Sequence, residues 1–136
     1  MIKCIFNLVT LEDFKKKCVL LNTYIYAMLA KPEVNDDHNI MRVFRRQGVT
    51  KDTCFLIIPI NLEKEQHWSL AIIANLNNTL TSNHYCLQLR DESDREHMPC
   101  IIYLDSLLQI SQETKKALNR AANLAMMIPT WNGQKL

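Results

Sequence analysis

Two short apolar segments, each with a titratable side chain at one end, constrain this chain more than any other feature. The first spans residues 68–74 and follows His67, and the second spans 100–104 and precedes Asp105. If the two segments pair as antiparallel strands, the end of one lies beside the start of the other, so the imidazole meets the carboxylate. A histidine that acts as a general base needs a partner that fixes its tautomer and stabilises its charged form. The pattern therefore predicts a His–Asp pair.

Both side chains also have an ordinary structural explanation. A histidine at a strand edge is commonly a polar boundary residue, and an aspartate followed by a serine commonly belongs to a turn. Trp68, which follows His67, is more often a core aromatic residue than a substrate contact. His67 and Asp105 are therefore candidate catalytic residues and Trp68 a candidate substrate contact, with the structural explanations left open.

Apolar periodicity predicts three helices and four strands. The helices span 22–31, 39–47 and 112–127. The strands span 54–60, 68–74, 85–89 and 100–104. Helices first, then strands, then a last helix indicate an α+β fold in which helices cover a mixed or antiparallel sheet.

Capping and breaking residues set the ends of these elements. Asn22 or Thr23 can cap the first helix, Gly48 follows the second, and Ser111 can cap the last. Pro32 follows the first helix and stops it. Pro59 is expected to mark the end of the strand over 54–60, because proline cannot donate to a sheet ladder.

Composition limits the function classes. A length of 136 residues fits one domain, and two glycines, Gly48 and Gly133, argue against phosphate loops and dinucleotide folds. The net charge of +2 is too small to imply binding to nucleic acid or to a membrane, and no apolar run is long enough to span one. The basic cluster of Arg42, Arg45 and Arg46 reads as a solvated face, with contact to a charged partner as the alternative.

Five scattered cysteines without a CxxC pair predict free thiols in a reducing compartment, nucleus or cytoplasm. Cys54 and Cys100 lie in predicted strands and are expected to be buried and inert. A catalytic cysteine typically sits at a helix N-terminus near an imidazole, and no cysteine here has that setting in the sequence. A rival interpretation is a zinc site, because His84, Cys86, His97 and Cys100 supply suitable ligand types.

Three runs of sequence carry a family resemblance. They are Ile58-Pro59-Ile60-Asn61, then His67-Trp68-Ser69-Leu70-Ala71-Ile72-Ile73, then Ile102-Tyr103-Leu104-Asp105-Ser106-Leu107. In this order they resemble the Ulp/SENP-type cysteine proteases, which are specific for SUMO and other ubiquitin-like proteins. Upstream, Leu21-Asn22-Thr23 is similar to the start of the family's first helix. The polar insert between the last two runs is most similar to the Ulp2-like branch.

The resemblance implies a papain-like α+β fold, a central mixed sheet flanked by helices, and cleavage after the diglycine tail of SUMO or a relative. It implies that His67 is the general base, that Asp105 orients it, and that Trp68 helps to roof a narrow tunnel for the two glycines. Partners would be SUMO or another ubiquitin-like protein, with neither nucleic acid nor membrane, and with no metal or cofactor.

The expected nucleophile is not found where the resemblance would place it. The family has an Asn-Gly-x-Asp-Cys-Gly run, and aligning Asn132-Gly133 with its Asn-Gly puts the nucleophile position on Leu136. We therefore expect a single, partial domain over 1–136, with the C-terminal part of the fold missing and no catalysis by the chain alone. Uncovered apolar surface on the sheet would then call for a second protein that covers it, a rearranged core or aggregation.

Three interpretations stay open. The chain is a truncated protease domain, or a pseudoprotease that binds SUMO or another protein without cleaving it, or an unrelated α+β domain stabilised by zinc. Retained binding separates the first two interpretations, and the separation of His67 from Asp105 separates both from the third.

Overall fold

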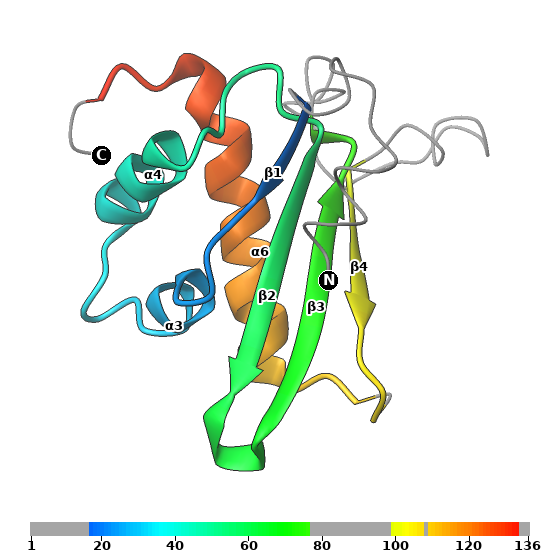
Figure 1. Ribbon diagram of the computed structural model, residues 1–136. Helices are drawn as coiled ribbons and strands as arrows, with labels where there is room; N and C mark the ends of the chain where they lie inside the picture. Colours follow the sequence, from blue (N-terminus) through cyan, green and yellow to red (C-terminus); the bar gives the residue numbers. More distant parts are fainter. Residues whose placement is uncertain (1–16, 77–98, 108, 134–136) are drawn as a thin grey trace.

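The computed structural model describes residues 17–76, 99–107 and 109–133 (Figure 1). Within them the elements follow in the order β1 (Cys18–Leu20), α3 (Ile25–Leu29), α4 (Asp37–Arg46), β2 (Phe55–Leu62), the 3-10 turn η1 (Glu63–Glu65), β3 (His67–Ala74), β4 (Cys100–Leu104), α6 (Gln112–Met127) and the 3-10 turn η3 (Ile128–Thr130). The predicted strand over 85–89 lies outside the described residues.

The four strands form one mixed sheet in the order β1-β2-β3-β4. The short strand β1, which sequence patterns did not predict, runs parallel to β2, whereas β2, β3 and β4 are antiparallel to their neighbours. Figure 1 shows α6 lying along the sheet, with α3 and α4 beside it. The predicted α+β fold, with a mixed sheet covered by helices, is confirmed.

One face of the sheet forms the core. Side chains alternate between the two faces of a strand, so Leu56, Ile58 and Ile60 of β2 all point to the helices and are fully buried. They join the apolar stripes of α4 and α6 in a single cluster, to which Phe44 and Leu118 contribute fully buried side chains. The helices are therefore held by the same face of the sheet.

The other face keeps large apolar side chains exposed. Trp68, Ile102 and Leu104 are each about half exposed, and they lie on the side of β3 and β4 that α6 does not cover. Cys100 belongs to the same outward set and is exposed, so the prediction that it is buried was wrong. The reason is that β4 pairs only with β3 among the described strands and turns alternate residues away from the helices.

Pro59 lies inside β2 and does not end it. The carbonyl of Ile57 accepts a hydrogen bond from Leu21 N just beyond β1, so the polar backbone groups of Ile57, and of Pro59 two residues on, face the β1 side. Because β1 pairs only as far as Ile57, the missing N–H of Pro59 costs no ladder hydrogen bond. The strand continues to Leu62.

The first helix is shorter than predicted. It covers five residues and has no side-chain cap, because the side chain of Asn22 instead accepts a hydrogen bond from Tyr24 N two residues on. That local bond makes a turn before the helix. The second and third helices match their predictions closely, with Asp36 and Ser111 as N-caps that accept from Asn39 N and Thr114 N.

Two polar contacts tie α6 to the elements beside it. The hydroxyl of Tyr26 in α3 lies 2.9 Å from that of Thr114 in α6. Arg120 donates to the Asp37 carboxylate at the start of α4 and to the carbonyl oxygens of Leu29 and Asn35. These contacts fix how the helices pack over the sheet.

We expect Ile58→Ala to lower the free energy of unfolding by about 3 kcal/mol, because it leaves a cavity in the core. The matched change Ile57→Ala, at the next position on the opposite face, should cost only about 1 kcal/mol, because this side chain is half-buried. Urea unfolding followed by circular dichroism measures both. An equal or reversed order would mean that the core lies on the other face.

Candidate functional site

The antiparallel pairing of β3 with β4 brings His67 and Asp105 together. Leu70 pairs with Leu104, so the same register places Asp105 opposite Ser69 and diagonal to His67 on one face. Nε2 of His67 lies 2.5 Å from Oδ1 of Asp105. The predicted juxtaposition of the imidazole and the carboxylate is confirmed, whereas their catalytic role is a proposal taken up below.

The carboxylate of Asp105 is enclosed by donors. Its side chain is 3% exposed, against 18% for His67. Besides the imidazole, Oδ1 accepts from the backbone N–H of Leu107 at 2.8 Å, and Oδ2 lies 3.1 Å from the hydroxyl of Tyr103. Three donors on one carboxylate fix its orientation, so the imidazole meets it in a single geometry.

These donors hold the pKa of Asp105 below its ordinary value of 3.8. The backbone N–H of Leu107 is the largest cause, and His67 and Tyr103 add to it against the opposing effect of burial. The carboxylate is therefore ionised at neutral pH and ready to stabilise an imidazolium.

Tyr103 and Ser69 extend the pair into a network that sequence reasoning missed. The Tyr103 hydroxyl lies 2.9 Å from Oγ of Ser69, and burial, together with the Asp105 carboxylate, raises the pKa of this phenol. A phenol has one proton to donate and a carboxylate is the stronger acceptor, so Tyr103 donates to Asp105. The signal was spacing: each residue stands two positions from a member of the pair, on the same strand face.

The geometry selects one tautomer of His67. A carboxylate only accepts hydrogen bonds, so the neutral ring must carry its proton on Nε2. Nδ1 then keeps a lone pair and makes no hydrogen bond within the described part of the chain. An imidazole of this kind can take a proton from a nucleophile at Nδ1 while Asp105 stabilises the resulting cation.

The turn before His67 is strained. Gln66 has a φ of +47°, in the left-handed region that a residue with a Cβ seldom adopts. It follows η1 and reverses the chain, so that β3 starts antiparallel to β2 at its very first residue, His67. Such strain costs of order 1 kcal/mol and is commonly kept next to functional residues.

Trp68 lies on the opposite face of β3 from Ser69. Its side chain is 57% exposed, so it is not a core residue. It is adjacent in the chain to His67, and its exposure leaves it free to contact another molecule beside the pair.

None of the three described cysteines lies near His67. Cys100 pairs with Ala74, at the far end of β3, and seven residues of strand span about 23 Å. Cys18 pairs with Phe55 and Cys54 precedes it, at that same distant end, where burial raises the pKa of both thiols. Cys4 and Cys86 lie outside the described residues.

The alignment of Asn132-Gly133 with the family's Asn-Gly does not fit the placement of these residues. Figure 1 shows α6 starting near the edge where β4 ends and running to the opposite end of the molecule, where η3 follows. The 16 residues of α6 span roughly 24 Å, and three further residues reach at most about 10 Å back. A nucleophile three residues after Gly133 would therefore not reach His67. Leu136 itself lies outside the described residues.

The described residues do not support the interpretation of a zinc site. Within ranges 17–76, 99–107 and 109–133, no group of three or more potential ligands could hold a metal ion. His84, Cys86 and His97 lie outside these ranges.

In the same ranges, no helix combines the length and the apolar character that a bilayer crossing needs.

Comparison with protein families places this chain by its sequence. The model of the Ulp1 protease family, C-terminal catalytic domain, matches residues 2–130, which include both strands of the site and end before Asn132. Comparisons with curated proteins and with solved structures gave no significant match.

We expect the neutral ring of His67 to carry its proton on Nε2, because Asp105 accepts from that nitrogen. Two-bond ¹H–¹⁵N correlation spectra distinguish the two tautomers. Asp105→Ala should give a mixture of both, while the signals of His38, which lies elsewhere in the fold, stay unchanged. A proton found on Nδ1 in the unchanged chain would contradict the geometry.

The lowered pKa of Asp105 predicts a dependence of stability on acid. A carboxyl with a lower pKa in the folded state stabilises the fold above pH 3.8, and that contribution is lost as the pH falls through the folded-state value. The difference in unfolding free energy between the unchanged chain and Asp105→Asn should therefore shrink below pH 3.8. Tyr103→Phe, which removes one donor, should show a smaller change of the same sign. Urea titrations at a series of pH values measure this, and a difference that stays constant would count against it.

Proposed function

This chain belongs to the Ulp1 protease family, and we propose that His67 and Asp105 are the general base and the orienting carboxylate of its peptidase centre. The observation that carries the proposal is the hydrogen bond from Nε2 of His67 to a carboxylate enclosed by three donors. It leaves Nδ1 unprotonated, as a base for a thiol must be.

In the proposed chemistry, Nδ1 of His67 takes the proton of a cysteine thiol, and the thiolate attacks the carbonyl carbon of the residue before the scissile amide. The imidazolium returns the proton to the leaving amine, and a thioester remains until water hydrolyses it. Asp105 stays ionised throughout and stabilises the imidazolium. Tyr103 and Ser69 are positioning residues that keep the carboxylate in place.

The nucleophile of this centre is not one of the described cysteines, since Cys18, Cys54 and Cys100 lie at the other end of the sheet. We propose that the chain alone does not cleave, and that the thiol on which its His–Asp pair acts is supplied from outside this chain. The polar segment 75–99 between β3 and β4 supports an assignment to the Ulp2-like branch of the family.

The partner we propose is SUMO or another ubiquitin-like protein, the kind of protein on which proteases of this family act. Trp68 stands exposed beside His67 and offers a flat apolar surface to the diglycine tail. Its exposed neighbours on the same face, Ile102 and Leu104, favour a second function, in which the domain binds such a protein without cleaving it.

Two measurements on the same preparation test these proposals. The unchanged chain should hydrolyse SUMO carrying a C-terminal fluorophore no faster than His67→Ala does, because no described thiol reaches the base. Turnover that His67→Ala abolishes would refute the lack of a nucleophile but support the role of the histidine.

The affinity for SUMO, measured by titration calorimetry, should fall by at least about tenfold in Trp68→Ala, as expected for an exposed aromatic side chain that becomes buried in the complex. Val34→Ala serves as the matched control, because it removes another exposed apolar side chain, in the segment between α3 and α4. If neither SUMO nor ubiquitin binds, or if both variants weaken binding equally, the assigned partner or the role of Trp68 is wrong.

A further inference from the structure

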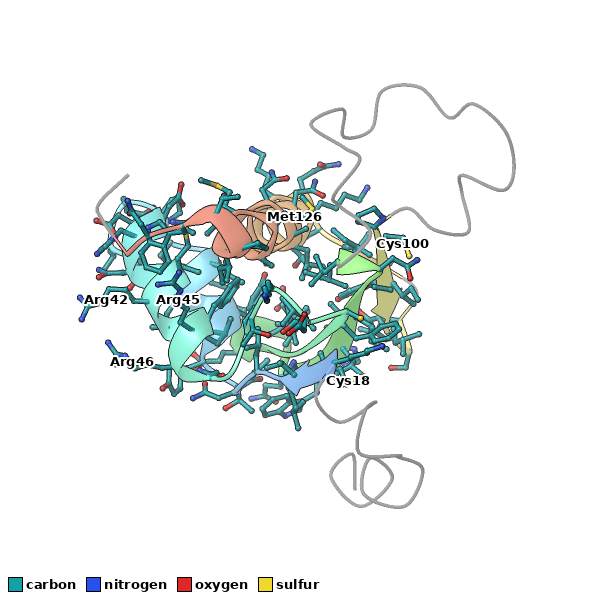
Figure 2. The ribbon with its side chains drawn as sticks, turned by 90° about the horizontal axis from the view of Figure 1, so that it is seen from above. Cys18, Arg42, Arg45, Arg46, Cys100 and Met126 are labelled. Carbon is teal, nitrogen blue, oxygen red and sulfur yellow. The ribbon has the colours of Figure 1, made fainter. Side chains whose placement is uncertain are left out.

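We propose that α4 and the segment after η3 form a binding site for a phosphate monoester, separate from the His–Asp pair. The site is a surface hollow of about 500 Å³ lined by His38, Arg42, Arg45, Arg46, Trp131 and Gly133. Figure 2 shows the three arginines together on α4, on the side of the molecule away from β4.

The spacing of the basic residues makes a continuous stripe. His38, Arg42 and Arg45 follow at intervals of four and three, which is the repeat of one helix face, and Arg46 stands one turn beyond Arg42. The core face of α4, with Ile40 and Phe44, points the other way. The amphipathic sequence that buries α4 therefore also gathers its cationic side chains on one side.

Arg45 is held in place by Trp131, which also lines the hollow. Its guanidinium carbon lies 4.3 Å from the centroid of the Trp131 ring, and Nη2 donates to the carbonyl oxygen of the same residue. The guanidinium also lies near Gly133, where an added Cβ would sit 3.7 Å from Nη1. A guanidinium fixed in this way loses little freedom on binding, so its remaining donors are preorganised for a ligand.

The cationic side chains at the rim have no acidic partner. Among the described residues, Arg42 and Arg46 make no ion pair, and the nearby carboxylates of α4 are already used, Asp36 as its N-cap and Asp37 by Arg120. Cations in the last turn of a helix gain stability from the helix dipole. That gain accounts for Arg45 and Arg46 but not for Arg42, nor for the hollow they share.

His38 forms another part of the wall of the hollow. It lines the hollow and meets the Trp131 ring edge-on at 5.3 Å, and its Nδ1 is buried with no hydrogen-bond partner in the described part of the chain.

Charge selects the class of anion. One carboxylate would leave most of the charge of three guanidinium groups uncompensated, whereas a phosphate monoester carries about −1.5 to −2 and three acceptor oxygens. One guanidinium group can bind two phosphate oxygens at once through two parallel N–H···O hydrogen bonds. The hollow exceeds a lone phosphate and falls within the ordinary range of ligand pockets, so it has room for the group that carries the phosphate.

Trp131 reports on binding directly. The chain has two tryptophans, so Trp68→Phe leaves Trp131 as the only one, and its fluorescence can be followed at constant ionic strength. The probes are N-acetyl-O-phosphoserine amide, inorganic phosphate and N-acetyl-aspartate amide. We expect saturable binding of the two phosphates and at least about tenfold weaker binding of the aspartate derivative. Tighter binding of the phosphoserine derivative than of inorganic phosphate identifies a phosphorylated side chain as the ligand, and the reverse order identifies free phosphate.

Matched variants separate a site from general attraction. Arg42→Gln and Arg46→Gln should each weaken phosphate binding by about tenfold, while Lys116→Gln, which removes an exposed charge from α6, should not. Circular dichroism confirms that each variant is folded. His67→Ala should leave binding unchanged, so this test does not depend on the proposed peptidase centre.

Three results would overturn the proposal: no saturation with either phosphate, equal weakening by Lys116→Gln, or equal affinity for the aspartate derivative. Strong binding of a single-stranded oligonucleotide alone, lost steeply as salt rises, would also overturn it, because it would show a general polyanion surface in place of a phosphate monoester site.

Discussion

The register of β3 on β4 is the constraint on which the candidate centre depends. With Leu70 opposite Leu104, the side chains of His67, Ser69, Tyr103 and Asp105 all fall on one face, beside α6. A slip of one residue would move Asp105 to the outer face and break every contact of the network. The buried residues that fix this register, among them Ala71 and Ile73, therefore also fix the geometry of the imidazole and the carboxylate.

The two faces of the sheet have different chemistry because side chains alternate along each strand. The inner face holds the core and, at one edge, the His–Asp pair, whereas the outer face presents Trp68, Ile102 and Leu104. A base and an exposed aromatic residue thus come from adjacent positions on one strand. In the proposed function, the base takes up the proton of the thiol and the aromatic side chain contacts the partner.

The length of α6 separates two sites. The His–Asp pair lies near the edge of the sheet from which the chain enters α6, and the basic hollow lies where Trp131 and Gly133 follow its far end. The same packing of α4 against α6 that closes the core turns the arginines of α4 outward toward that hollow. Substitutions at one site are therefore expected to leave the other intact.

Local sequence determined the helix of α6 with its Ser111 cap, the strands β2, β3 and β4, and the meeting of His67 with Asp105, because apolar periodicity and polar strand ends are local signals. Only the tertiary structure decided that Pro59 stays inside a strand, that Cys100 is exposed, and that Asn132-Gly133 lies far from the His–Asp pair. Each of these depends on which neighbour stands beside a strand or where a helix ends in space. Such contacts join residues distant in the chain, and no local pattern of residues encodes them.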